Sequence, residues 1–195
     1  MRFKQIARNL LERYNSKSIC KWEYTHPNPF SIKERAVEFA FVFRIISELY
    51  PKRILDVGTG TSSLPHLMYL GGFDVTAVDN LKEYWGGRPV NRHFHVLSDD
   101  IRDPKLQDQF DIITCVSVLE HIEDSDRAMA GMFKLLKPGG SLLLTMPYSE
   151  SKYIKNVYEL PDSSYGQDKN YITQSYSRQE LNRWMEANGG EIVEQ

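Results

Sequence analysis

The sequence has few of the residues that mark secreted, membrane or metal-binding proteins. Only two of its 195 residues are cysteines, Cys20 and Cys115, and their spacing does not suit a metal site. Cys115 lies in an apolar segment, so we expect it to be a buried thiol. No apolar run approaches the ~20 residues of a membrane helix, and the first residues lack the apolar stretch of a signal peptide. These absences favour a protein of the reducing cytoplasm without a membrane segment.

An excess of basic residues is also missing. The chain has 24 Lys and Arg against 26 Asp and Glu, which gives a formal net charge of −2, and no run resembles a basic arm. Nothing in this balance favours nucleic acid as a partner. His93 and His95 have no acidic or cysteine partner at ligand spacing, so we predict no metal site. The length fits one domain, and 41% hydrophobic residues are enough for a sizeable core.

Two closely spaced glycines follow a short apolar run near residue 55. The run Arg53–Val57 lies between Pro51 and Gly58, and it predicts a buried strand. Gly60 comes two residues after Gly58. Helical apolar spacing then appears at Leu64, Leu67, Met68 and Leu70. The pattern predicts a strand, a glycine turn and a helix, in which the absence of Cβ atoms lets a ligand approach the backbone closely.

Two acids support a nucleoside site at this turn. Asp56 precedes Gly58, and Asp79 ends a second strand-like run about 20 residues after Gly60, where such units hold ribose hydroxyls. A Gly-x-Gly turn alone is common in α/β proteins, so these acids carry the inference. An NAD site fits less well, because Ser63 replaces the third glycine and a carboxylate is badly placed beside a diphosphate.

The segment Leu55-Asp56-Val57-Gly58-Thr59-Gly60-Thr61 resembles motif I of class I S-adenosylmethionine-dependent methyltransferases. The resemblance covers about residues 51–195 and implies an α/β, doubly wound, Rossmann-like, mostly parallel sheet. It also implies S-adenosyl-L-methionine as cofactor. The loop residues Asp56, Gly58, Thr59 and Gly60 would shape the methionine pocket, and Asp79 with Asn80 would hold the ribose.

A third strand is expected around 93–97, followed by a loop rich in aspartate. In the resembled family, an acid of this loop accepts the adenine amino group and the next backbone N–H reaches a ring nitrogen. Asp100 with Ile101 fits these roles best, and Asp99 is the alternative. The other interpretation is that these aspartates only cap the turn, which is a common use of Asp.

A fourth strand, Phe110–Val116, is dense in β-branched residues, as a buried parallel strand should be. Ser117 and the segment Leu119-Glu120-His121 follow it. They face the site, because ligands bind beyond the carboxyl ends of such strands. We expect Ser117 to line the cofactor. His121 could be a general base, since its unperturbed pKa lies near working pH, or a structural histidine that holds the loop.

The later segments predict a turn, a fifth strand and a long tyrosine-rich stretch. Lys137-Pro138-Gly139-Gly140 would turn the chain after a helix that ends near Leu136, and 141–146 would form the strand. Residues at about 148–176 carry six tyrosines and leave the sheet beside the presumed methyl group. A stretch of this length is often functional, so we interpret it as an acceptor lid; simple surface packing is the alternative.

The two ends complete the predicted organisation. Residues 1–50 form an N-terminal helical cap, in which a helix from Ser31 to about Tyr50 buries Val37, Phe41, Ile45 and Leu49. Residues 51–195 form the core. Glu191–Gln195 should start a sixth strand, where the resembled family continues with a strand pair that is incomplete here. The open edge could pair with a second copy of the chain.

The interpretation is an S-adenosylmethionine-dependent methyltransferase that acts on a small molecule, such as a sugar, a lipid precursor or a secondary metabolite. An amino methyltransferase of nucleic acids would show Asn/Asp-Pro-Pro-aromatic after the fourth strand, and Val116-Ser117-Val118-Leu119 stands there instead. Two alternatives remain. One is a non-catalytic module that only binds the cofactor, and the other is a NAD-dependent oxidoreductase.

Overall fold

The computed structural model describes residues 6, 10, 34–80, 91–163 and 172–195. The chain divides into two compact units, Met1–Arg35 and Ala36–Gln195. The expectations for Cys20, for Ser31 and for most of the N-terminal cap lie outside the described residues, as do those for the tyrosines at 165 and 171. All of the described strands belong to the second unit.

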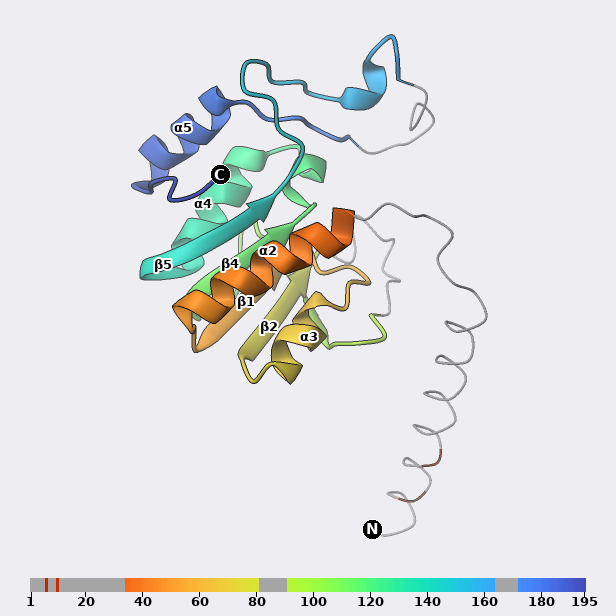
Figure 1. Ribbon diagram of the computed structural model, residues 1–195, viewed down its shortest axis with the longest axis vertical. Coiled ribbons are helices and arrows are strands. Elements are labelled where there is room, and N and C mark those ends of the chain that lie inside the picture. The colour runs from red at the N-terminus through yellow and green to blue at the C-terminus, as the bar shows by residue number, and fades with distance from the viewer. Residues whose placement is uncertain (1–5, 7–9, 11–33, 81–90, 164–171) are drawn as a thin grey trace. The chain divides into compact units, whose positions relative to one another are not determined.

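The second unit is built on one sheet of five parallel strands in the order β3-β2-β1-β4-β5 (Figure 1). The strands are β1 Arg53–Val57, β2 Asp74–Asp79, β3 Val96–Ser98, β4 Phe110–Val116 and β5 Leu136–Thr145. The order reverses between β1 and β4, where connections leave toward opposite edges. In open α/β sheets ligands bind beyond the carboxyl ends of the strands at this point. The predicted doubly wound α/β fold is confirmed.

Helices cover both faces of the sheet (Figure 1). They are α2 Glu34–Leu49, α3 Leu64–Leu70, α4 Ser125–Leu135 and α5 Arg178–Asn188, with short 3-10 turns at Leu119–His121 and Val157–Glu159. Side chains of α2 and α3 share one hydrophobic cluster, and those of α4 and α5 share another. Within the described part of the chain, none of the helices is long and apolar enough to cross a membrane.

Alternation along the strands divides the core into these two clusters. Ile54 and Ile112 pack with α2 and α3, whereas Leu55 and Ile113, one residue further on, pack with α4. This is the period of two that a pleated strand imposes, with both faces covered. Cys115 is fully buried on the α4 side as a free thiol, which confirms the expectation, and burial raises the pKa of that thiol.

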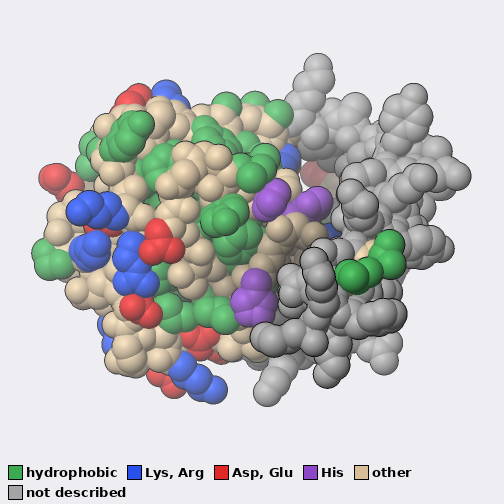
Figure 2. All heavy atoms as spheres, turned by 90° about the horizontal axis from the view of Figure 1, so that it is seen from below, with side chains coloured by type: hydrophobic (Ala, Val, Ile, Leu, Met, Phe, Trp, Pro, Cys, Tyr) green, Lys and Arg blue, Asp and Glu red, His purple; other side chains and the backbone are tan. Residues whose placement is uncertain are grey.

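The surface mixes charges. On the face shown in Figure 2, basic and acidic side chains lie near one another with hydrophobic side chains between them. The exposed hydrophobic side chains of α3 include Tyr69 and Leu70. The mixture agrees with the nearly balanced charge of the sequence.

The predicted sixth strand is wrong. Residues 191–195 form no strand, and Val193 is 88% exposed. Gly189 ends α5 in the left-handed conformation, and Glu194 then forms an ion pair with Arg44 of α2. A strand needs a neighbour for its backbone hydrogen bonds, and this tail contacts a helix through a side chain instead.

Three element boundaries or faces also differ from expectation. The strand β5 begins at Leu136 and not at residue 141 as predicted. Leu136 already pairs with Phe110, and the register shifts at residues 137–140 before Ser141 pairs with Ile112. The third strand starts at Val96 and is shorter than predicted. On α2 the buried residues are Glu38, Val42 and Ile46, one position beyond the predicted face. Val37 and Leu49 are exposed.

Helix α4 approaches the loop after β3 so closely that only glycine fits at one position. A Cβ added to Gly131 would lie 1.8 Å from the Ile101 carbonyl oxygen. Ile101 is buried in the core beneath the same helix. The missing side chain therefore sets how closely α4 and the 99–104 loop pack.

We expect Gly131→Ala to lower the free energy of unfolding by about 2 kcal/mol, because overpacking against backbone outweighs the gain in helix propensity of about 1 kcal/mol. Ala130→Ser on the exposed side of α4 is the control, with an expected loss of about 0.5 kcal/mol. Denaturant unfolding monitored by circular dichroism measures both. A Gly131→Ala protein as stable as the wild type, or more stable, would contradict the close packing.

Candidate active site

The loop between β1 and α3 folds back over the carboxyl end of β2. Gly58 and Gly60 have positive φ angles of 72° and 51°, which residues with a Cβ adopt only at a cost. The Gly58 N–H donates to the Val78 carbonyl at 2.9 Å, and the Thr59 N–H donates to the same oxygen at 3.3 Å. The glycine pair therefore holds the backbone close to the ends of both strands.

Asp79 holds the same loop from β2. Its side chain is 7% exposed, and its Oδ2 accepts a hydrogen bond from the Gly60 N–H at 2.7 Å. A carboxylate offers about four lone-pair sites, so one such acid can accept from several donors at once. The structure thus brings together the glycine turn and the second acid, which are 19 residues apart in the sequence.

Asp56 connects the loop to the central strands. Its Oδ2 accepts from Thr59 Oγ1 at 2.6 Å and its Oδ1 accepts from Thr114 Oγ1 at 2.7 Å. All three side chains are buried. Hydrogen bonds to a buried carboxylate are strong because one partner is charged. Asp56 therefore joins β1, the loop and β4, and Thr114 is a residue of the site without a sequence signal of its own.

Asn91 holds the loop from its outer side. Its Nδ2 donates to the carbonyls of Gly60 at 3.0 Å and Ser62 at 2.9 Å, while its Oδ1 accepts from the backbone N–H groups of His93 and Phe94. One amide thus ties the start of the 91–95 segment to the glycine loop. The sequence gives no warning of this contact, because it joins segments about 30 residues apart and an Asn in a loop is common.

The aspartates after β3 lie beside the end of β2. Asp100 Oδ2 accepts from Asn80 Nδ2 at 3.4 Å, and the Arg102 guanidinium binds both carboxylate oxygens at 2.7–3.1 Å. The side-chain hydrogen bond from Arg102 lowers the pKa of Asp100. Asp99 accepts from the backbone N–H groups of Lys105 and Leu106 and so shapes the turn. The two acids thus have different partners: the Asp99 side chain binds the turn, and the Asp100 side chain faces Asn80, directly after β2.

A second group of residues follows β4. Ser117 has a positive φ of 52°, which is uncommon for a residue with a side chain. Its Oγ donates to Glu38 of α2, and its N–H donates to the carbonyl and the Oγ1 of Thr145, both at 3.0 Å. The hydroxyl of the predicted site residue Ser117 therefore points to Glu38, which no sequence pattern marked because Glu38 lies on the apolar side of a helix.

His121 sits at the end of the short turn after β4, with a side chain 25% exposed. Its Nδ1 lies 2.8 Å from the Ile172 carbonyl oxygen. A carbonyl only accepts, so Nδ1 carries the proton and Nε2 of the neutral ring is an acceptor. Nε2 lies 4.0 Å from Glu120 Oε1, a carboxylate that is buried. The contact with the Ile172 carbonyl thus favours the tautomer in which the lone pair is on Nε2.

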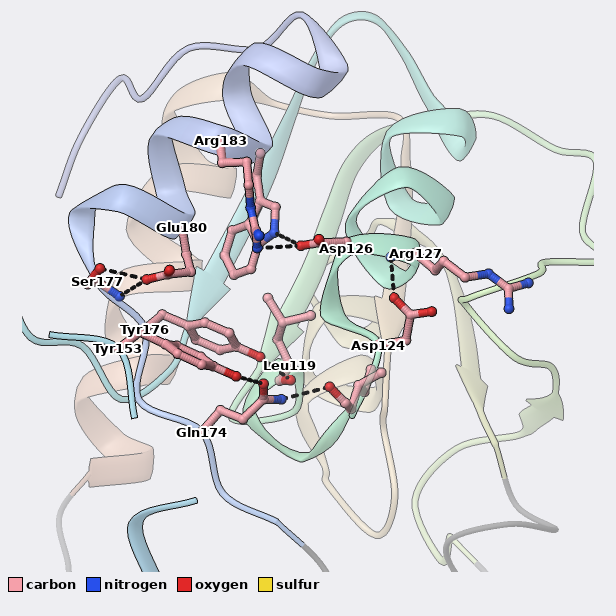
Figure 3. Close-up of polar contacts among 12 residues, drawn as sticks. Leu119, Asp124, Asp126, Arg127, Tyr153, Gln174, Tyr176, Ser177, Glu180 and Arg183 are labelled. Carbon is pink, nitrogen blue, oxygen red and sulfur yellow. Dashed lines mark hydrogen bonds and ion pairs between the residues drawn. The ribbon is translucent and has the colours of Figure 1, made fainter. Parts of the chain in front are cut away.

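The segment 172–176 fixes the turn that carries His121. Gln174 is 2% exposed; its N–H donates to the Glu120 carbonyl at 2.9 Å and its Nε2 to the Ile122 carbonyl at 2.7 Å. Tyr176 Oη donates to the Leu119 carbonyl at 2.8 Å. Figure 3 shows the Gln174 and Tyr176 side chains pointing at this turn. Four consecutive residues, 119–122, thus find partners in one distant segment.

The described tyrosines of the predicted lid have different surroundings. Tyr176 is fully buried and its ring packs edge-on against Trp184, with centroids 4.9 Å apart, so it belongs to the core. Tyr153 Oη donates to Gln174 Oε1 at 2.6 Å (Figure 3). Tyr148 contacts Glu150 and Arg178 at the surface. These contacts give three of the tyrosines structural partners; an acceptor lid stays a prediction.

The arrangement can bind a ligand that carries hydrogen-bond donors. Buried or half-buried carboxylates of Asp79 and Asp100 lie at neighbouring strand ends, and beside them the backbone at Gly58 and Gly60 has no Cβ. Such acids accept from hydroxyl and amino groups. An imidazole with an acceptor nitrogen, His121, stands on the loop after β4. The geometry suits recognition of a nucleoside at the ends of β1 and β2, and His121 follows β4 at the same end of the sheet.

Curated proteins similar in sequence are methyltransferases. The ubiquinone biosynthesis O-methyltransferase of Pseudomonas fluorescens (strain Pf0-1) is 29% identical over 103 residues, 48% of this chain and 44% of that protein. The enzyme of the same name from Marinobacter nauticus (strain ATCC 700491 / DSM 11845 / VT8) is 32% identical over 103 residues, 48% of this chain and 43% of that protein. The matched region thus spans less than half the length of these relatives.

Solved structures share the fold. One is Burkholderia thailandensis 1,6-didemethyltoxoflavin-N1-methyltransferase with bound 1,6-didemethyltoxoflavin and S-adenosylhomocysteine; the TM-score is 0.61 at 16% identity, over 96% of this chain and 81% of that chain. Another is an S-adenosylmethionine-dependent methyltransferase from Clostridium acetobutylicum ATCC 824, with a TM-score of 0.53 at 16% identity, over 93% of this chain and 89% of that chain.

A family model described as a methyltransferase domain matches residues 32–195. The match includes α2, all five strands and both groups of site residues. It covers far more than half of the 195 residues. The chain therefore belongs to this family of methyltransferase domains.

Proposed function

We propose that the protein transfers a methyl group from S-adenosyl-L-methionine to a small-molecule acceptor. The observation that carries the proposal is the pairing of Asp79 with the Gly60 N–H, 2.7 Å apart, at the carboxyl ends of β1 and β2. This hydrogen bond joins the backbone of a glycine to a buried acid at the end of the sheet where open α/β folds bind ligands. The family of the chain and the cofactor products in related folds support the same conclusion.

The residues present fit the nucleoside part of this cofactor. Asp79 would accept hydrogen bonds from the ribose hydroxyls, with Asn80 beside it, and Asp100 with the Ile101 backbone would hold the adenine. The lowered pKa of Asp100 keeps that carboxylate ionised, as an acceptor for an amino group should be. At Gly58 the space that a Cβ would need is taken by the Val118 side chain, with Cγ1 2.3 Å from that position, so the methionine part would lie over the rest of the loop backbone. Asp56 and Thr59 would shape that pocket from below through their mutual hydrogen bond.

When bound, the cofactor supplies an electrophilic methyl group on a positively charged sulfur. Because such a group needs little activation, the protein mainly has to position the acceptor and exclude water. For a hydroxyl acceptor, His121 Nε2 would take up the proton, and the nearby Glu120 carboxylate would balance the charge that forms on the ring. The Ile172 carbonyl keeps the proton on Nδ1 and so leaves Nε2 ready for this role.

The related proteins include an O-methyltransferase and an N1-methyltransferase by name. We therefore propose a metabolite with a hydroxyl or ring nitrogen as acceptor. We further propose that the protein works in the cytoplasm, where the buried free thiol of Cys115 stays reduced. We expect neither nucleic acid nor a membrane as partner. The edge strand β5, which has a neighbour only in β4 among the described strands, could pair with a second copy of the chain.

Cofactor binding tests the proposal directly. We expect calorimetry to detect micromolar binding of S-adenosylhomocysteine and none of NAD. Asp79→Asn keeps an oxygen for the Gly60 N–H but replaces one acceptor by a donor, so affinity should fall about 10- to 100-fold, as for losing a hydrogen bond to a charged group. The control is Asp74→Asn, at the exposed start of the same strand. A folded wild-type protein that gives no heat with S-adenosylhomocysteine would defeat the proposal.

The role of His121 is tested by separating binding from transfer. An acceptor is first found by screening hydroxyl and ring-nitrogen compounds for release of S-adenosylhomocysteine. For a hydroxyl acceptor, His121→Gln should lower kcat about 100-fold or more, as loss of a general base does. The dissociation constant of S-adenosylhomocysteine should change little. His95→Gln, at an exposed position beyond the site, should leave both values unchanged. Wild-type kcat in His121→Gln would assign this histidine a structural role.

A further inference from the structure

One buried acid is outside the roles assigned so far. Glu38 lies on α2 and is only 7% exposed, although it sits on the side of the helix that packs with Val42 and Ile46 against the sheet. Its Oε1 accepts from Thr145 Oγ1 at 2.6 Å and from Ser117 Oγ. A carboxylate is costly to bury unless it is hydrogen-bonded. An apolar residue would suit the packing of α2 better, so the position of Glu38 calls for a reason beyond packing.

The two hydroxyls that Glu38 binds stand at the carboxyl ends of neighbouring strands. Ser117 directly follows β4, and Thr145 is the last residue of β5. Thr145 Oγ1 donates to Glu38 and also accepts from the Ser117 N–H at 3.0 Å. The three residues therefore form a closed ring of hydrogen bonds at the sheet edge where methyl transfer is proposed. Glu38 is the only charged group in that ring.

The ring holds Ser117 in a conformation that its sequence does not favour. A φ of 52° places Ser117 in the left-handed region, which residues with a Cβ seldom occupy. Such conformations persist where surrounding contacts determine them, and they are frequent at functional sites. Here the backbone N–H of Ser117 is held by Thr145 and its hydroxyl by Glu38. Without the acid, the hydroxyl loses the partner that orients it.

The conformation of Ser117 determines where the next residue goes. Val118 places its methyl groups against Gly58: a Cβ added to Gly58 would lie 2.3 Å from Val118 Cγ1. The turn Leu119–His121 starts immediately after Val118. A change at Ser117 would thus move both the side chain that contacts the glycine loop and the start of the turn that carries His121.

We propose that Glu38 is a positioning residue: through Ser117 it sets the segment after β4 so that Val118 supports the cofactor loop and the following turn presents His121. The proposal rests on the proposed function for its ligand readout, but the conformation itself can be measured without ligand. It also makes α2, which precedes the first strand, a functional part of the site. The competing view is that Glu38 only fastens α2 to the sheet.

The test uses the full chain and four variants. Glu38→Met keeps the length of the side chain and removes the acceptor, whereas Glu38→Gln keeps one neutral acceptor oxygen. Ser117→Gly adopts a positive φ freely and has no hydroxyl to hold. The double variant Glu38→Met/Ser117→Gly completes a cycle. Calorimetry with S-adenosylhomocysteine, thermal unfolding and amide hydrogen exchange of residues 117–121 are measured for each.

We expect Glu38→Met to weaken S-adenosylhomocysteine binding at least about fivefold and to speed amide exchange across residues 117–121. For both binding and exchange, Glu38→Gln should give values between those of Glu38→Met and the wild type. In the Ser117→Gly background, the effect of Glu38→Met on affinity should shrink to less than about twofold, because coupled residues are not additive. Glu48→Gln, on the exposed side of the same helix, should change neither readout.

One outcome would overturn the proposal and leave Glu38 a purely structural residue. In it, Glu38→Met lowers the melting temperature but keeps wild-type affinity for S-adenosylhomocysteine and wild-type amide exchange at residues 117–121. The proposal would also be overturned if Glu38→Met lowered the affinity for S-adenosylhomocysteine equally in the wild-type and Ser117→Gly backgrounds. If Glu38→Met does not fold, Glu38→Gln decides by the same two readouts. If the wild type folds but binds no S-adenosylhomocysteine, the proposed function fails, while the exchange data still decide whether Glu38 sets the segment.

Discussion

The hydrogen bond from the Gly60 N–H to Asp79 is the contact on which the site depends, because it closes the loop after β1 onto the end of β2. The loop has little regular structure of its own, and its two glycines make the unfolded chain flexible there. Its shape therefore has to come from neighbours. Asp79 supplies one fixed point, Asp56 with Thr114 a second, and Asn91 a third. Together these protein contacts fix the backbone of the loop, and a loop fixed in this way spares a ligand the cost of ordering it.

Four acids lie around the carboxyl ends of the strands, and three kinds of donor stabilise them. Asp56 is held by hydroxyls, Asp79 by a backbone N–H, Asp100 by a guanidinium and Glu38 by hydroxyls again. Unpaired, such carboxylates would repel one another or take up protons. With these donors in place the carboxylates are fixed in direction, as a preorganised polar site requires. For Asp100 the donor is the positively charged guanidinium of Arg102, and its hydrogen bond lowers the pKa of Asp100.

The parts of this site that follow from local sequence were predictable, and those that depend on distant contacts were not. The glycine pair and the strand Phe110–Val116 follow from patterns within about ten residues, and Asp79 follows from its place about 20 residues after the glycines. Glu38 was missed because Val37, Phe41, Ile45 and Leu49 share the same helical spacing as the true buried face, and only the sheet decides between two faces. The sixth strand was wrong because β-branched residues favour strands only where a neighbour exists, and this tail binds Arg44 instead.

The turn after β4, which carries His121, shows why distant contacts matter in the candidate site. A 3-10 turn of three residues has few hydrogen bonds of its own, so its position is set from both sides. On one side Ser117 is held by α2 and β5; on the other, residues 119–122 are held by Gln174, Tyr176 and the Ile172 carbonyl. Val118, in between, touches the glycine loop. Segments far apart in the sequence thus act on one short turn, and a displacement in either would reach the loop through Val118. The glycine loop and His121 are therefore coupled through Val118, although no local sequence pattern joins them.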